Sequence, residues 1–313
     1  MTALPSLLRR RPATRAAAGR RRAPGGEQLA GWAFVTPGAA IIILFGAVPI
    51  IWSAVMSFQH NNLLSGSTPF VGTANYRQLV HDPIVAQAIQ HTLVYTALFV
   101  PGTMIVGLFL AVAMNRKIRG IAIYRTAAFA TMAISTISEA IVFIWLFDPS
   151  FGVVNWFFSL VGIPQQQFLN SPSQALYVIV VMTIWGWTGF SVVIYLAALQ
   201  GVPQTLLEAA AIDGASAWQS FRRITLPLLS PATLFLAVWL TINALQLFDE
   251  VYLSTQGGPL NATTVLVYYI YTQAFQDFNF GYASAIAYLL FIVIVVVTAI
   301  QFRVSRRFTY YRS

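Results

Sequence analysis

The sequence predicts an all-α membrane protein that crosses the bilayer about six times. Hydrophobic residues make up 58% of the 313 positions and charged residues only 9%, whereas soluble domains carry about 25% charged residues. The mean hydropathy is +0.70. The apolar residues gather in runs long enough to supply the roughly 20 residues that a membrane-spanning helix needs. This composition excludes a disordered chain, a disulfide-rich secreted scaffold and almost any soluble enzyme.

Six apolar runs are the expected spans. The first two contain proline, which membrane helices tolerate when neighbouring groups satisfy the freed carbonyls. The longest stretches between runs have about 30 residues, fewer than the roughly 50 of a soluble domain. We therefore expect a transmembrane domain over residues 29–313, preceded by a flexible basic tail at 1–28. The six runs cover roughly residues 32–58, 88–114, 121–147, 173–200, 231–253 and 280–302.

The net charge of +9 marks orientation rather than a nucleic-acid site. All 18 Lys and Arg residues except Arg77 lie in the tail, beside the loops after the second and fourth spans, or at the C-terminal end. Basic loops stay on the cytosolic side, so both termini are expected in the cytosol. A nucleic-acid surface would need a continuous basic patch, and here long uncharged runs separate the clusters.

The sequence contains no pattern for a metal or nucleotide site. It has no cysteine, and its three histidines, His60, His81 and His91, share no ligand spacing. No phosphate-binding GxxxxGK[ST] loop occurs. A transporter with this sequence must therefore draw its energy from an ion gradient or from a partner subunit.

The loop between the fourth and fifth spans, residues 200–228, predicts two short helices. Residues 204–212 are mostly good helix formers, and Gly214 can supply the positive φ that ends a helix. A second amphipathic helix is expected over 215–224, with Pro227 ending it. Small and apolar residues exposed in a cytosolic loop are typical of a docking surface. The alternative is a helix that lies on the membrane.

This loop resembles the EAA loop of permease subunits in binding-protein-dependent ABC importers. The resemblance rests on three ordered motifs, Glu208-Ala209-Ala210, Asp213-Gly214-Ala215 and Ile224-Thr225-Leu226-Pro227. Outer segments are similar to those of the carbohydrate and glycerol-phosphate members, and the chain looks most like the first permease of a two-permease pair. These segments are Phe70-Val71-Gly72, Asn75-Tyr76, Thr255-Gln256-Gly257-Gly258-Pro259, Asn261-Ala262-Thr263-Thr264 and Tyr268-Tyr269-Ile270-Tyr271.

The resemblance implies a type I ABC importer permease in the plasma membrane of a prokaryote. It implies four kinds of partner: a second permease, two ATP-binding subunits, an extracytoplasmic solute-binding protein and the lipid bilayer. ATP and Mg would bind the partner subunits, so this chain would be neither an enzyme nor a cofactor protein. The solute would be a sugar, a glycerol phosphate or a glycerophosphodiester, imported by alternating access.

The resemblance also implies which residues couple this chain to an ATPase. Glu208 would be the charged contact and Gly214 the bend. The other coupling residues implied are Ala209, Ala210, Asp213, Ala215, Arg222, Arg223, Leu226 and Pro227.

Polar residues inside the expected spans are candidates for the solute pathway. Glu139 lies within the third span, where an ionisable group is costly and therefore a functional candidate. Trp239, Asn243 and Gln246 recur at i, i+4 and i+7 on one face of the fifth span, and two amides with an indole suit a sugar or polyol. Asp249 lies near the outer end of that span. The alternative is that such side chains only hold helices together.

Charge constrains the solute further. Residues 126–221 and 224–302 contain no Lys or Arg, so this chain would not hold a phosphate group with cations inside the membrane. The acidic residues Asp249 and Glu250 lie near the outer end of the fifth span, where their side chains can reach the lipid headgroups. A quaternary ammonium would suit the aromatic residues with Glu139, so glycerophosphocholine-like diesters stay open beside sugars.

Two other functions are compatible with a six-span chain. An ion-coupled secondary transporter of a small polar solute would predict broken midplane helices and internal repeats, and no repeat is evident in the sequence. A membrane scaffold that transports nothing is the other. Retention of an ATPase subunit on purification distinguishes both from an ABC permease.

Overall fold

The computed structural model describes residues 24–61, 68–116 and 119–305. Its regular structure in these ranges is helical, apart from one isolated antiparallel bridge between Gln59 and Phe70. The chain divides into two compact units, Met1–Trp52 and Ser53–Ser313. The all-helical prediction is therefore confirmed for the described residues.

The first unit contains most of the first expected span. Helix α1 (Pro24–Ile42) continues through a π-helical turn, η1 (Ile43–Ala47), into α2 (Val48–Met56), which runs past the end of this unit. The segment Gly31–Met56 is long and apolar enough to cross a membrane. Helix α1 begins within the stretch expected to be a tail, and residues 1–23 of that stretch lie outside the described residues.

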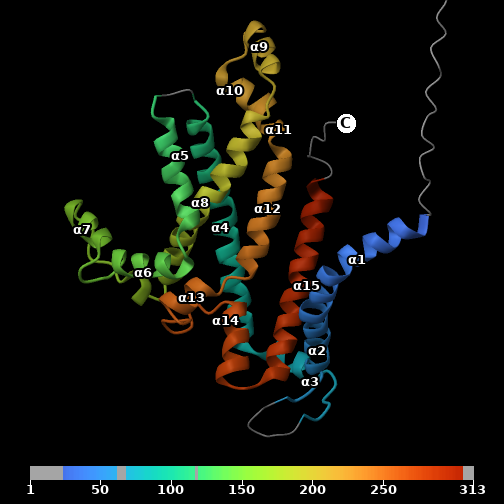
Figure 1. Ribbon diagram of the computed structural model, residues 1–313. Helices are drawn as coiled ribbons and strands as arrows, with labels where there is room; N and C mark the ends of the chain where they lie inside the picture. Colours follow the sequence, from blue (N-terminus) through green and yellow to red (C-terminus); the bar gives the residue numbers. More distant parts are fainter. Residues whose placement is uncertain (1–23, 62–67, 117–118, 306–313) are drawn as a thin grey trace, which may run out of the picture. The chain divides into compact units, whose positions relative to one another are not determined.

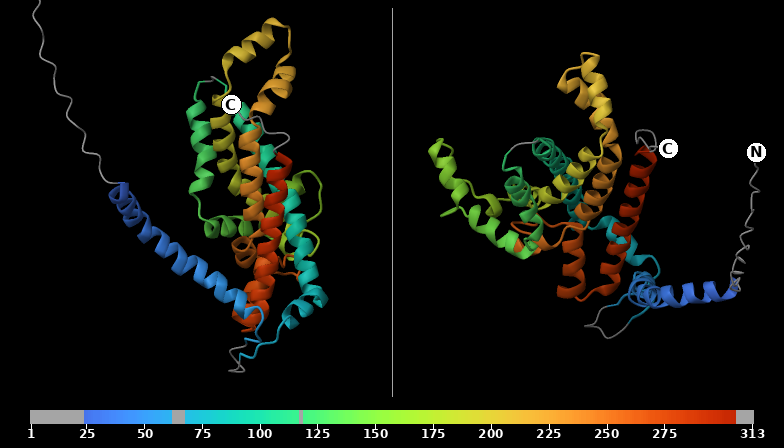
Figure 2. Two further views of the ribbon diagram at one scale, coloured as in Figure 1. Left: turned by 90° about the vertical axis from the view of Figure 1, so that its right-hand side faces the viewer. Right: turned by 45° about the horizontal axis from the view of Figure 1, so that its top comes forward.

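The second unit is built on four long helices. Helix α8 packs along α4, α12 packs on α4 and α8, and α15 packs on α12. Figures 1 and 2 show α9 and α10 at one end of this unit and α14 toward the other. The four helices are α4 (Pro83–Met114), α8 (Ala175–Gln200), α12 (Ser230–Leu245) and α15 (Phe280–Ser305).

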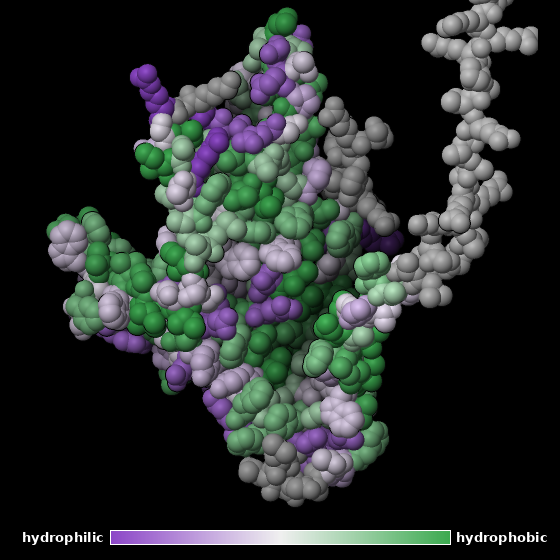
Figure 3. Space-filling view, in the orientation of Figure 1, coloured by the Kyte–Doolittle hydropathy of each residue, from purple (hydrophilic) through white to green (hydrophobic). Residues whose placement is uncertain are grey.

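Shorter helices complete the second unit. The connections between long helices carry α3 (Ala74–His81), α7 (Val153–Leu160), η3 (Phe168–Asn170), α14 (Leu266–Tyr271) and η5 (Thr272–Gln276). The loop expected to form two helices consists of α9 (Gln204–Ile212), α10 (Ala217–Ser220), η4 (Phe221–Thr225) and α11 (Leu226–Leu228). Figure 3 shows polar side chains gathered at the end that carries this loop, above a surface that is mostly apolar.

Helix α4 begins five residues before the expected start of the second span, because Asp82 caps it. The Asp82 carboxylate accepts hydrogen bonds from the backbone N–H groups of Ile84 and Val85 at 2.8 and 3.4 Å. Its second oxygen accepts from the hydroxyls of Tyr269 and Tyr282 at 2.8 and 2.6 Å. Burial raises the pKa of Asp82, but these hydrogen bonds outweigh burial and leave the pKa below its ordinary value. One carboxylate thus joins α4, α14 and α15.

The third expected span is not one helix. It consists of α5 (Ile121–Ala130), a 3-10 turn η2 (Thr131–Ala133) and α6 (Thr136–Leu146), and the two helical parts meet at 103°. Ile134 and Ser135 are extended, and the Ser135 hydroxyl caps α6 by accepting from the N–H of Ser138 at 3.3 Å. The prediction of a continuous helix was wrong because hydropathy does not distinguish a capped bend from a straight run.

The fifth expected span is also shorter than predicted. Helix α12 ends at Leu245, and a break of three residues separates it from α13 (Asp249–Ser254). At its other end, the helical segment Ala217–Leu228 meets α12 at 62°. Pro227 does not end the second helix of the loop as expected, because it lies in the first turn of α11, where proline needs no N–H partner.

The described residues therefore contain four helices able to span a membrane, or six if each bent pair is one span. The predicted number of about six is matched only when the bent pairs are counted.

The core of the second unit lies between α4 and α8. Ser191 of α8 lies so close to Gly107 that a Cβ atom at Gly107 would be 2.5 Å from the Ser191 Cβ. Small residues at such a crossing let two backbones approach closely. Larger side chains fill the space on either side of the crossing, including Tyr95, Phe99, Ile179, Leu236 and Leu240.

Candidate functional site

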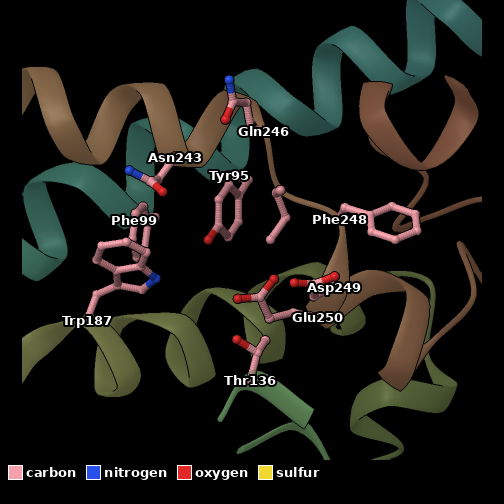
Figure 4. Close-up of a pocket in the computed structure, with 10 residues that line it drawn as sticks. Tyr95, Phe99, Thr136, Trp187, Asn243, Gln246, Phe248, Asp249 and Glu250 are labelled. Atoms are coloured by element: carbon pink, nitrogen blue, oxygen red, sulfur yellow. The ribbon is translucent and has the colours of Figure 1, made fainter. Parts of the chain in front are cut away.

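A cavity of about 190 Å³ lies where the two breaks in the helices face the long helices. Helix α4 contributes two rings to its wall, α8 an indole, α12 the Asn243 amide and α6 the Thr136 hydroxyl. The break after α12, which includes Gln246, and the first turn of α13 supply the remaining wall (Figure 4). The lining residues are Tyr95, Phe99, Thr136, Trp187, Asn243, Gln246, Leu247, Phe248, Asp249 and Glu250.

A second cavity, of about 210 Å³, adjoins the first. The two share Thr136, Trp187 and Glu250 in their walls. Glu139 and Phe190 line only the second. The two neighbouring cavities have polar and aromatic walls.

Glu139 is buried at the wall of the second cavity. Its side chain is 8% exposed, and its carboxyl group lies against Gly186 of α8. The Oε1 atom has no hydrogen-bond partner among the described residues. Glu139 occupies the first turn of α6, where the helix dipole favours a negative group. The bend after η2 creates this helix start, so the break in the third span positions the carboxyl.

Asp249 and Glu250 reach the first cavity because a break in their span also starts a new helix. The break after Leu245 starts a new helix, and both acids lie in the first turn of α13. Glu250 is partly buried and lines both cavities, whereas Asp249 is exposed and lines only the first. Helix α13 packs on α6. The two breaks therefore bring carboxyl groups from separate spans to one space.

The predicted polar stripe on the fifth span is only partly in the cavity. Asn243 and Gln246 line the first cavity, and the Asn243 amide donates to the Trp239 carbonyl at 2.8 Å. Trp239 lines neither cavity. It is 44% exposed, and its ring stacks on Phe235 with 6.1 Å between centroids. Only the part of the stripe at the C-terminal end of α12 therefore lines the cavity, and Trp239, one turn earlier on the same face, does not.

Several cavity residues were not predicted. The sequence placed Glu250 near the outer end of a span, and its pattern did not single out Tyr95, Phe99, Thr136 or Trp187. Tyr95 and Phe99 stack at 5.2 Å on one face of α4. The available signal was a tyrosine, Tyr95, in the second span and a tryptophan, Trp187, in the fourth. The sequence does not show that these two side chains face the same cavity.

The cavity carries carboxyl groups and no cation. Among the residues that line either space, Glu139, Asp249 and Glu250 are acidic and none is Lys or Arg. The described residues contain no group of three or more His, Cys, Asp or Glu that could hold a metal ion. The chemistry available is therefore hydrogen bonding to acids, amides and hydroxyls beside aromatic rings.

The loop at the opposite end forms the expected helix and turn. Helix α9 ends before Gly214, whose φ of +77° provides the left-handed stop, and Ser216 and Gln219 form a capping box at α10. Glu208, Ala209 and Asp213 are exposed, as are Arg222, Arg223 and Leu226. Ala210 is buried, while Ala215 and Pro227 are partly buried. Most predicted coupling residues thus lie on an accessible surface.

Comparison with known proteins assigns the chain to a family. A family model described as "Binding-protein-dependent transport system inner membrane component" matches residues 103–310. The chain belongs to this family. The matched residues run from inside α4 through the loop α9–α11 and past the end of α15. They therefore include both cavities except for Tyr95 and Phe99 of α4.

The permease has relatives of nearly its own length. It is similar to the lactose transport system permease protein LacF of Rhizobium radiobacter, at 36% identity over 282 residues, 88% of this chain and 94% of the relative. It is also similar to the sn-glycerol-3-phosphate transport system permease protein UgpA of Yersinia pestis, at 34% identity over 269 residues, 86% and 90% of the two chains.

A solved structure shares the fold of this permease. A chain of a bacterial ABC transporter involved in the import of the acidic polysaccharide alginate superposes with a TM-score of 0.81 at 26% identity. The superposition covers 91% of this chain and 98% of the other. The expectation of an ABC importer permease fold is confirmed. The chain is a multi-pass inner-membrane transport component rather than an enzyme, and the comparisons do not favour an ion-coupled transporter.

Proposed function

We propose that this chain is one of two permease subunits in an importer that brings a sugar or glycerol-phosphate-type solute into the cytoplasm. Two ATP-binding subunits would hydrolyse ATP with Mg, an extracytoplasmic binding protein would deliver the solute, and this chain would bind no cofactor itself. The cavity between α4, α6, α8, α12 and α13 would be its part of the pathway.

The observation that carries the proposal is the exposed loop α9–α11. A short helix that ends on a left-handed glycine and presents Glu208, Ala209 and Asp213 is accessible to a partner groove. The second helix bends by 62° into α12, which ends at the cavity. A movement of α9 can therefore be transmitted along α12 to Asn243 and Gln246.

The proposal also fixes the orientation. If α9 meets an ATP-hydrolysing subunit, the end carrying α9 and α10 is cytosolic. Helix α15 ends after Arg303, and basic residues in such positions are typical of the cytosolic side. Both termini would then be cytosolic, as the distribution of Lys and Arg in the sequence predicts.

The cavity supports the solute class. Lactose, sn-glycerol 3-phosphate and alginate are named for the relatives and the solved transporter described above. All are polyhydroxylated. Amides, carboxyls and the Thr136 hydroxyl can bond hydroxyl groups, and the Trp187 indole and Tyr95 ring offer flat faces for a sugar ring.

Copurification tests the proposal. The chain is coexpressed with its partner permease and an ATP-binding subunit, and the complex is isolated in detergent. We expect the ATP-binding subunit to be retained by the wild type and by Gln204→Lys, an exposed control on the first turn of α9. Glu208→Lys should lose it while the chain still inserts. Absence of an ATP-binding subunit from the wild-type complex would refute the assignment.

A further inference from the structure

We propose that Glu139 and Glu250 form one acidic subsite in the pathway, which accepts hydroxyl groups of an uncharged sugar or polyol and excludes anionic solutes. This inference rests on the proposed function and narrows its solute class. It separates this permease from the sn-glycerol-3-phosphate and alginate transporters that resemble it, whose named solutes are anionic.

Geometry brings the two acids to one space. Glu139 lies in the first turn of α6 and Glu250 in the first turn of α13, and α6 packs on α13. Both side chains line the second cavity, and Glu250 continues into the first. Neither position would meet the other in straight spans, because each acid follows a break in its helix.

Glu139 is oriented for a ligand. The residue is more than nine-tenths buried at the cavity wall, and Oε1 lacks a hydrogen-bond partner in the described part of the chain. A buried polar atom without a partner is costly. The carboxyl lies against Gly186, which lines the same cavity. Because Oε1 itself is buried, a solute hydroxyl in this cavity would supply the missing donor after a rotation of the carboxyl.

The surrounding groups favour an uncharged polyol. The carboxyls of Glu139 and Glu250 accept hydrogen bonds, while Asn243 and Gln246 add amide donors for hydroxyl oxygens. Figure 4 shows the Tyr95 ring and the Trp187 indole on the same space as the carboxyls of Asp249 and Glu250. An ammonium group would use the acids but not the amide donors. A polyol uses both.

An anion would have no counter-charge in this space. None of the residues that line the two cavities is Lys or Arg, and three are acidic. A phosphate or carboxylate there would lose its hydration shell and gain no cation in exchange, which is costly in a medium of low dielectric constant. The acid pair therefore acts as a charge filter for solutes that fit by shape.

Binding of matched sugars to the complete permease–ATPase complex tests the filter. The complex is held in nanodiscs without binding protein, and saturation-transfer NMR is used to titrate lactose against lactose 6′-phosphate and glycerol against sn-glycerol 3-phosphate. We expect the neutral member of each pair to bind at least about tenfold more tightly. The double variant Glu139→Gln, Glu250→Gln should reduce this ratio severalfold, because glutamine keeps the shape and replaces each acid with an amide that can donate a hydrogen bond to an anion.

Asp277→Asn is the matched control, since Asp277 is exposed and lines neither cavity. It should leave the ratio unchanged. Equal or tighter binding of the anionic member, a ratio that the double variant does not alter, no binding of either neutral sugar, or tighter binding of an aminated lactose would each overturn the inference. Retention of the ATPase subunit in the same preparation tests the proposed function separately, so the two can fail independently.

Discussion

The carboxyl group of Glu139 lies directly against Gly186: a Cβ atom at Gly186 would be 2.5 Å from both carboxyl oxygens. The contact joins the first turn of α6 to the middle of α8. Because the glycine leaves room for the acid, the two residues must be considered together.

Gly186→Ala is predicted to destabilise the protein by about 1 kcal/mol, the low end of the cost of overpacking, because the atoms that meet the new methyl group lie at the end of the flexible Glu139 side chain. The added methyl group forces the Glu139 carboxyl from its position. Glu139→Ala removes the obstacle, so the double variant should be less destabilised than the sum of the single changes. Denaturant unfolding in detergent measures all three. Additive effects would show that the contact does not exist.

Gly201→Ala is the control for the double-mutant cycle of Gly186 and Glu139. It lies at the C-terminal end of the same helix, and its Cβ would meet its nearest atom at an ordinary distance of 3.4 Å. Its stability should change by less than about 0.5 kcal/mol, the usual range for a substitution without a special contact.

The sequence predicted an all-α fold, six apolar runs and two short helices in the loop 200–228. These features follow from the hydropathy pattern and from the positions of proline and glycine. The sequence did not predict the breaks at Ile134–Ser135 and after Leu245. The bend in the third span needs only two residues in extended conformation, one of which is a capping serine. Isoleucine and serine also occur inside straight membrane helices, so their presence does not reveal the bend. Glu250 was consequently placed at the end of a span instead of beside Glu139.

The capped start of α4 was available in the sequence as Asp82 followed by Pro83. This pair is typical of an N-cap and first helical position. The two tyrosines that also bond Asp82 were not predictable, because they lie 187 and 200 positions further along the chain.

Asp82→Asn is predicted to lower the free energy of unfolding at neutral pH by about 1 kcal/mol or more, because hydrogen bonds to a charged acceptor are stronger. The pKa of Asp82 lies below its ordinary value of 3.8 in the folded protein. Its contribution is therefore complete above that ordinary value and is lost as pH falls through the lower native pKa.

The measurement is the unfolding midpoint of wild type and Asp82→Asn as a function of pH. The difference between them should be constant from neutral pH down to the ordinary pKa and should shrink only below it. A difference that grows as the pH falls would have the wrong sign for a stabilised carboxylate.

Gly107→Ala should separate α4 from α8 and lower stability by about 1–3 kcal/mol, because the new methyl group meets the Cβ and backbone of Ser191. Gly102→Ala is a matched comparison on the same helix. Its methyl group meets the end of the flexible Ile184 side chain at 2.6 Å, which can rotate away. We expect the second variant to unfold closer to wild type, and the reverse order would contradict the packing described.

Gly214→Pro should abolish uptake while leaving insertion intact. Gly214 has a φ of +77°, whereas proline fixes φ near −65°. Gly214→Ala retains the backbone N–H donor, and the left-handed conformation costs alanine about 1–2 kcal/mol. We therefore expect this variant to retain part of the uptake activity. Uptake and membrane content are compared in the same cells, and normal uptake by the proline variant would refute the role of this turn.

In the proposed importer, ATP on the partner subunits changes access to the cavity between α4 and α13. The chain has no cysteine, so Asn243→Cys places a single thiol at the cavity wall. Its reaction with an impermeant maleimide is followed from the side that carries α9, in the complete complex. We predict that trapping with ATP and vanadate slows labelling, that collapsing ion gradients has no effect, and that Glu208→Lys removes the response. Labelling that ignores ATP and follows an ion gradient would contradict the account.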